Sequence, residues 1–147
     1  MIRTESEYQS SRKRLEESNS MLKAQQRKLT QEGLKPEQIK RALDPVRSFV
    51  AQIAEEIESY ERLKRGEFQE LKNLRGIGEL LIGVRVALGL TQRELAEKLG
   101  VHETQVSRDE RNEYFGVTVE RAGKILETLG VEVLIRVERL PELAKSA

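Results

Sequence analysis

The sequence predicts a mainly α protein: long N-terminal helices forming a hairpin or coiled-coil arm, then a domain of four to five short helices, and one C-terminal β-strand. Three observations predict this order. Apolar residues recur every three or four positions over most of the 147 residues, as on one face of a helix. Glycines and capping residues divide the second half into short helical segments. Residues 131–137 instead alternate with the period of two of a strand.

The composition excludes several classes of protein. Charged residues make up 35% of the chain and hydrophobic residues 37%; typical globular proteins have about 25% and 45–50%. With no cysteine and one histidine, we expect no disulfide, metal site, cofactor or enzymatic activity. No apolar run approaches the ~18 residues of a membrane span, and no signal peptide is visible. We therefore expect a soluble, cytoplasmic protein without membrane contacts.

Residues 1–66 are expected to form a helical arm. Leu15, Leu22 and Leu29 recur every seven residues in a segment without Pro or Gly, which Gly33 ends. The second segment carries a stronger stripe, with alternating spacings of four and three, which is typical of a coiled coil or helical hairpin. It comprises Ile39, Leu43, Val46, Val50, Ile53, Ile57 and Tyr60.

The start of this second helix is open. Asp44 is a good N-cap and Pro45 is tolerated in a first turn, so the main helix can begin at Pro45; the alternative is one kinked helix from Pro36. We expect the two long helices to pack antiparallel, as a hairpin or across a dimer. A stripe that serves only as intramolecular core is equally compatible with the spacing.

Residues 67–130 are expected to form the second domain. It should open with a short helical piece carrying Phe68, Leu71 and Leu74 at spacing three. A helix follows that ends at Gly89, and its inward stripe comprises Ile77, Leu80, Leu81, Val84 and Leu88. Near its end we expect a further helix, Val119–Leu129, with Thr118 as cap and Gly130 as stop.

The strongest local signal lies between these helices. Thr91 and Glu94 form a capping box that predicts a helix starting at Gln92. Leu90 and Leu95 occupy the positions of a hydrophobic staple around the same helix start. That helix should end at Gly100, where a left-handed residue is needed. The next helix should cover about Glu103–Arg111, with Asn112 as its stop.

The tail, residues 131–147, differs in period. Val131, Val133, Ile135 and Val137 alternate with Glu132, Leu134, Arg136 and Glu138. β-Branched residues with period two predict a strand. A lone strand leaves its backbone groups unpaired, and no second strand is evident. We therefore expect pairing with a symmetry mate or with another protein.

Two short helices joined by a tight turn form the geometry of a helix-turn-helix. Ala96 is small because the two helices cross closely there, and Gly100 makes the turn. The wedge between the helices should be filled by Leu95, Leu99, Val101 and Val106. This packing leaves the outward face of the second helix free to lie in a major groove.

Residues 84–130 resemble the XRE/Cro family of helix-turn-helix regulators, which includes lambdoid phage repressors and many antitoxins. The matching residues are Arg85, the run Leu88–Val101, Gln105–Arg108 and Glu110. The resemblance implies a lambda-repressor-like DNA-binding domain. It also implies that Arg85 and Glu110 form a structural ion pair.

The DNA-facing positions are carried over from the same resemblance. Gln92 resembles a glutamine that grips a phosphate and braces a base contact. The implied DNA-binding residues are Gln92, His102, Glu103, Thr104, Gln105, Ser107, Arg108 and Asn112. Among these, glutamine can pair with adenine and arginine with guanine, while Ser107 and Asn112 are placed to reach phosphates.

Three residues depart from the family pattern. Asp109 stands where a bulky apolar residue usually packs inward, so it is exposed, salt-bridged or displaced by a shifted helix end. His102 stands where a Ser, Thr or Asp cap is commoner. Glu103 repels phosphate unless it accepts a hydrogen bond from a cytosine amino group. For each base-facing residue, a solvated surface role is the competing interpretation.

The function implied is a sequence-specific DNA-binding transcriptional regulator, a repressor acting as a homodimer on a palindromic operator in double-stranded DNA. No segment is strongly basic, and the net charge is only +1, so dimerisation would have to assist the affinity. The alternative is an antitoxin of the HigA kind, which resembles residues 77–137. Such a chain would neutralise a protein toxin through its arm or strand and autoregulate its operon.

Overall fold

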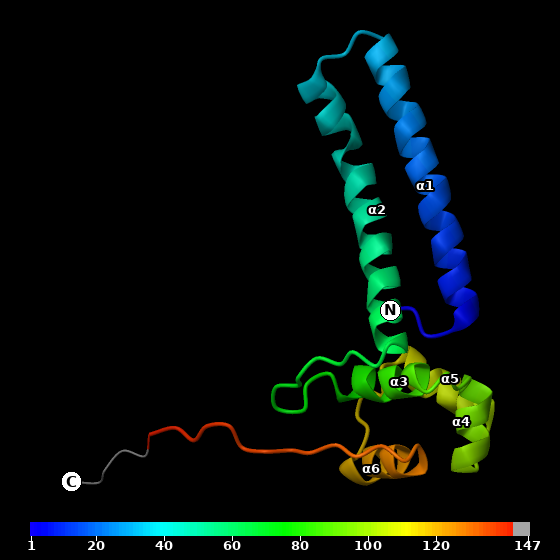
Figure 1. Cartoon of the computed structure of the whole chain (residues 1–147), viewed down its shortest axis with the longest axis vertical. Coiled ribbons are helices and arrows are strands. Elements are labelled where there is room, and N and C mark those ends of the chain that lie inside the picture. The colour runs from blue at the N-terminus through cyan, green and yellow to red at the C-terminus, as the bar shows by residue number, and fades with distance from the viewer. Residues whose placement is uncertain (143–147) are drawn as a thin grey trace.

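The computed structural model describes residues 1–142, and within them the chain forms six helices and no strand (Figure 1). The mainly α prediction is therefore confirmed. In chain order the helices are α1 (Glu5–Gln31), α2 (Pro36–Lys64), α3 (Ile77–Ala87), α4 (Gln92–Leu99), α5 (Glu103–Arg111) and α6 (Val119–Thr128). Among the described helices, none combines the length and the apolar character that crossing a membrane requires.

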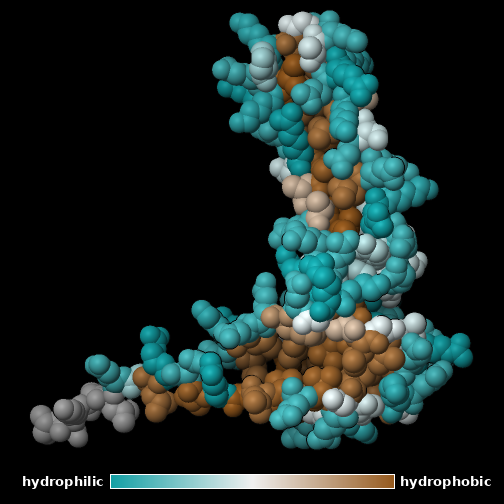
Figure 2. All heavy atoms as spheres, viewed as in Figure 1, coloured by the Kyte–Doolittle hydropathy of each residue, from teal (hydrophilic) through white to brown (hydrophobic). Residues whose placement is uncertain are grey.

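Helices α1 and α2 pack antiparallel as a hairpin within one chain (Figure 1). Gly33, with a φ of 81°, ends α1 as its position predicts. Leu15, Leu22 and Leu29 are half-buried, and α1 contains no fully buried residue. The buried side of the hairpin belongs to α2 and comprises Ile39, Leu43, Ile53, Ile57 and Tyr60. Figure 2 accordingly shows a mostly hydrophilic arm with a thin apolar seam.

Helix α2 runs without interruption from Pro36 to Lys64 and contains Pro45 in its interior. The single helix from Pro36 is thus correct, and a helix start at Pro45 is wrong. An interior proline costs about 3 kcal/mol. Leu43 and Ile53, on either side of Pro45, are both buried in the hairpin, and this packing offsets the cost.

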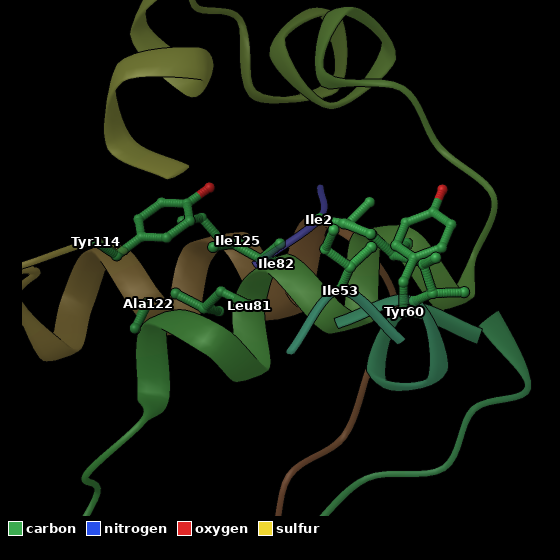
Figure 3. Close-up of a cluster of buried hydrophobic side chains, with 10 residues drawn as sticks. Ile2, Ile53, Tyr60, Leu81, Ile82, Tyr114, Ala122 and Ile125 are labelled. Atoms are coloured by element: carbon green, nitrogen blue, oxygen red, sulfur yellow. The ribbon is translucent and has the colours of Figure 1, made fainter. Parts of the chain in front are cut away.

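The four short helices gather at the base of the arm (Figure 1), and α3 and α6 share one hydrophobic core with it (Figure 3). Ile53, Ile57 and Tyr60 come from α2. They meet a buried set from the short helices, the loops and the N-terminal segment: Ile2, Leu81, Ile82, Val86, Tyr114, Ala122 and Ile125. The base of the arm therefore cannot move freely relative to α3 and α6.

Two expectations for the second domain are wrong. The predicted helical piece at residues 68–74 is a loop, and Asn73 and Leu74 have positive φ angles of 52° and 62°, which a right-handed helix cannot contain. Leu88, predicted to point inward, lies just beyond α3 and is 48% exposed. The spacings, three within residues 68–74 and four from Val84 to Leu88, are those of a helix, but the backbone leaves the helical conformation before Leu74 or Leu88 can pack inward.

The predicted strand at residues 131–137 is not formed in this single chain. From Val131 onward the chain runs away from the bundle as an extended segment (Figure 1). A strand requires a neighbour to complete its backbone hydrogen bonds, and the described part of the chain supplies none. Leu134, Ile135 and Val137 are consequently exposed. Residues 143–147 of the expected tail lie outside the described residues.

Candidate nucleic-acid interface

Helix α4 begins at the capping box that its sequence predicts. The backbone N–H of Glu94 donates to the Thr91 hydroxyl at 3.1 Å, and the backbone N–H of Thr91 donates to the Glu94 carboxylate at 2.7 Å. The Thr91 hydroxyl also donates to the Glu94 carboxylate, at 2.9 Å. The two donors of Thr91 hold the pKa of Glu94 below its ordinary value, the backbone N–H contributing most. The start of α4 is therefore fixed by contacts within four consecutive residues.

The turn between α4 and α5 contains Gly100, which ends α4 as predicted, and His102, which precedes the start of α5. Gly100 adopts the left-handed conformation, with φ 68° and ψ 32°. His102 caps α5, because the backbone N–H of Thr104 donates to its ring Nδ1 at 3.3 Å. His102 therefore accepts a hydrogen bond from the first turn of the helix, as a Ser, Thr or Asp cap does in other helices.

A small apolar wedge holds α4 against α5. Leu95, Ala96 and Val106 are 0%, 2% and 1% exposed, and they form a cluster of their own. Leu99, Val101 and Leu129 of the surroundings pack against this cluster. The two helices therefore meet through the residues that their spacing predicts, with Ala96 at the close crossing.

Arg85 and Glu110 form a buried ion pair between α3 and α5. Both are almost inaccessible to solvent, at 2% and 0% exposure. Arg85 Nε lies 2.5 Å from Glu110 Oε1, and Arg85 Nη2 lies 2.7 Å from Oε2. This bidentate arrangement matches the planar fork of a guanidinium to a carboxylate. It sets the position of α5 relative to α3.

Further hydrogen bonds extend this ion pair into a network across the domain. Arg85 Nη1 donates to the carbonyl of Leu90 at 2.6 Å, and Nη2 donates to the carbonyl of Arg3 at 2.8 Å. Gln92 Nε2 donates to Glu110 Oε2 at 2.8 Å. The network thus joins α3, α4 and α5 to the segment that precedes α1.

The sequence-predicted DNA-facing residues fall into two groups. His102, Glu103, Thr104, Arg108 and Asn112 are exposed at the start and end of α5. Gln105, Ser107 and Gln92 are half-buried. Gln92 therefore braces Glu110 in the free protein, while the exposed group is available to another molecule.

The charges of α5 are sorted between its inner and outer sides. Asp109 forms an ion pair with Arg121 of α6, so of the three possibilities left open for Asp109 the salt-bridged one is observed. Glu110 is neutralised by Arg85. Arg108 and Arg111 are exposed and have no ion-pair partner within residues 1–142. The outer side of the second half of α5 is therefore positive.

Sequence reasoning missed two contacts of this site. The charge of Asp109 at an expected inward position was a signal for a basic partner, although Arg121 was not identified. The carbonyl of Arg3 gave no signal, because any residue supplies a carbonyl. Of two aromatic residues in the loop after α5, Tyr114 is buried, which raises its pKa, whereas Phe115 is 96% exposed.

Comparison with known protein families matches residues 83–135, just over a third of the chain, to the family described as helix-turn-helix. The matched range begins within α3 and ends in the extended tail, so it contains the wedge, the Arg85–Glu110 ion pair and α5. No curated protein and no solved structure matches the chain.

Proposed function

We propose that this chain is a DNA-binding transcriptional regulator. The match of residues 83–135 to the helix-turn-helix family supports this proposal. In this proposal the protein is a repressor that binds an approximately palindromic operator as a homodimer. Two copies of α5 enter successive major grooves, about 34–36 Å apart. The bound dimer blocks polymerase, in the first place at its own promoter.

The positive outer face of α5 carries the proposal. Asp109 and Glu110 are both paired inward, and Arg108 and Arg111 remain available on the outside. The buried network holds α5 in place before DNA arrives. A recognition helix that is already positioned loses little conformational entropy on binding.

Base contacts are assigned to Gln105 and Arg108. Glutamine can bond adenine and arginine can bond guanine through two hydrogen bonds each, worth roughly 1–3 kcal/mol of discrimination per pair. Gln92, Ser107 and Asn112 are assigned to phosphates. The remaining residues of the surface, His102, Glu103 and Thr104, lie at the start of α5 and complete the base-facing side.

Dimerisation supplies affinity that the charge of one copy does not. The net charge of +1 gives little general attraction to a phosphate backbone. A second linked domain converts the second half-site contact into an intramolecular step. The operator should therefore be symmetric.

The test is selection of bound sequences from random duplex DNA with the full chain at ~150 mM salt, because affinity depends on salt. We expect an approximately palindromic site. Gln105→Ala and Arg108→Ala should each weaken binding to it by about 1–3 kcal/mol with unchanged melting. Lys13→Ala, which removes an exposed charge from α1, is the matched control and should bind normally. Wild-type binding by both α5 variants would refute the assigned face.

Exposed apolar side chains favour a second candidate, an antitoxin. Phe115, in the loop before α6, is 96% exposed, and Val119, the first residue of α6, is 76% exposed. Leu134, Ile135 and Val137 in the segment after α6 are exposed as well. A protein toxin could cover them. Co-expression with a small basic protein encoded in the same operon would test this: relief of its toxicity supports the antitoxin, and unchanged toxicity refutes it.

A further inference from the structure

Residues 131–137 form a largely apolar segment, most of which no other part of residues 1–142 covers. The segment is tied to the bundle at its start, where the Val131 N–H donates to the Leu126 carbonyl at 2.9 Å. Beyond this point, Leu134 is 86% exposed, Ile135 75% and Val137 78%. In Figure 2 the apolar surface of the bundle continues onto this segment. An extended, uncovered, alternating segment is a template for strand pairing.

The segment is complementary to itself in one antiparallel register. If two copies pair about a two-fold axis at Leu134, Glu132 of each copy lies opposite Arg136 of the other. Val133 then faces Ile135, and Val131 faces Val137. Opposite charges meet on one face and apolar side chains on the other, and both kinds of cross-strand pair are stabilising.

Neighbouring registers lose this complementarity. A shift by one residue sets the apolar face of one strand against the charged face of the other. Centring the axis on Val133 sets Glu132 against Leu134, and centring it on Ile135 sets Glu132 against Glu138. A parallel, in-register pair would align like charges. Of the registers compared, only the one centred on Leu134 places opposite charges across from each other.

We infer that residues 131–137 of two copies of this chain pair antiparallel about Leu134 and that this ribbon joins the dimer. The inference deepens the homodimer of the proposed function and rests on it. A two-stranded ribbon alone is only marginally stable. Its apolar face, with Val131, Val133, Ile135 and Val137, therefore needs an apolar surface to cover it in the dimer. The apolar surface of the bundle, which adjoins this segment in Figure 2, can supply that cover.

The existing contact of Arg136 is compatible with this register. Arg136 Nη2 lies 2.6 Å from Glu138 Oε1, and both side chains are largely exposed. The two residues are on the same face of an extended segment, so Arg136 can keep this neighbour while it meets Glu132 of the other copy. Exposed pairs of this kind contribute little by themselves, and the local contact therefore does not compete with pairing.

Charge reversal with sedimentation equilibrium of the full chain tests the register. Glu132→Arg and Arg136→Glu should each weaken self-association about tenfold or more, because both symmetry-related pairs become repulsive. Mixing the two variants in equal amounts should restore association, since every cross-strand pair is then again of opposite charge. Glu142→Arg makes the same charge change outside the paired segment and should associate like the wild type.

Cross-linking provides a second test that does not depend on the strength of an ion pair. The chain contains no cysteine, so Leu134→Cys creates a single thiol at the two-fold axis. Oxidised glutathione should convert this variant into a covalent dimer, while Leu140→Cys, beyond the paired segment, should not become cross-linked on the same timescale. Equally fast cross-linking of both variants would overturn the register.

The outcomes separate this inference from the proposed function. A chain that is monomeric at every concentration overturns the ribbon and the homodimer together. A dimer that persists in both charge variants and gains nothing on mixing overturns the ribbon alone and leaves the homodimer standing. Wild-type operator binding by both α5 variants, with the mixing result intact, overturns the assigned DNA-binding face and leaves the ribbon and the dimer standing.

Discussion

The arm and the helix-turn-helix are both helical, but they are stabilised in different ways. In α4 and α5 the caps, the left-handed turn and the wedge lie within residues 91–106, and a buried ion pair adds the connection to α3. The arm also has a capping box, between Thr4 and Glu7, and a left-handed stop at Gly33, but α1 has no fully buried residue and its seam depends on α2. Two regions of similar helix content should therefore respond differently to substitution.

The largest expected effect is at the buried ion pair. Arg85→Ala leaves Glu110 buried with only Gln92 as a side-chain partner, so the free energy of unfolding should fall by about 3–5 kcal/mol. Urea denaturation measures this. Arg93→Ala removes an exposed ion-pair partner of Glu97 and should change the free energy of unfolding by less than about 1 kcal/mol. Equal effects of the two variants would contradict the importance of burial.

A pair of truncations compares the two ends of the arm. Ile57→Ala, in the core shared with α3, should cost about 2–4 kcal/mol. Leu22→Ala, half-buried in the distal hairpin, should cost about 1 kcal/mol, because less apolar area is lost. Amide hydrogen exchange should show faster opening near Leu22 only in the second variant. Global destabilisation of equal size by both would mean that the arm has one uniform core.

Two glycines should give effects of opposite sign. A Cβ at Gly78 would lie 1.8 Å from the carbonyl oxygen of Glu113, so Gly78→Ala should destabilise the domain by about 1–3 kcal/mol. Gly123 lies inside α6 with nothing within 4 Å of such a Cβ, so Gly123→Ala should stabilise by about 0.5–1 kcal/mol. Thermal melting checks both. Destabilisation by Gly123→Ala would show that α6 is packed more tightly than described.

The smallest expected effect concerns two carboxylates with lowered pKa values. The lowered pKa of Glu94 arises mainly from the backbone N–H of Thr91, and that of Glu5 from the side chains of Gln9 and Lys64. Such groups stabilise the folded state above their unfolded pKa and lose this contribution as pH falls through the folded pKa. Both helix starts should therefore loosen only below about pH 4.

Salt distinguishes the two carboxylates. High salt should raise the titration midpoint of Glu5 towards its ordinary value, because the ion pair with Lys64 is screened. The midpoint of Glu94 should change less, since a backbone hydrogen bond is not screened in the same way. Carboxyl NMR titration at two salt concentrations measures both. A larger change at Glu94 would contradict the backbone origin of its shift.

The same comparison explains what the sequence could predict. The start of α4 at Thr91, the turn at Gly100 and the wedge around Ala96 depend on residues close in sequence, and all three were predictable. For α2, the sequence predicted which residues share the apolar face. Whether its partner was α1 of the same chain or a second copy depended on tertiary contacts, and so did the continuation of α2 through Pro45.

The failures have a common physical origin. Residues 68–74 have the spacing of a helix, but Asn73 and Leu74 turn in the left-handed region instead. Residues 131–137 have the spacing of a strand, but hydrogen-bond partners must come from elsewhere. Periodicity describes which side chains share a face. It does not supply the neighbour that makes that face stable. The hydrogen bond from Arg85 to the Arg3 carbonyl cannot be read from the side-chain pattern, because every residue has a carbonyl.

The most direct measurement of the central claim is an amide NMR titration of the full chain with the duplex obtained by selection. The account predicts that the largest shift changes follow the exposed side of α5, at Thr104 and Arg108, with almost none in the distal arm around Leu22. It also predicts that the Gln105→Ala and Arg108→Ala variants lose these changes. Largest changes in the distal arm, with α5 unaffected, would contradict the claim that α5 reads DNA.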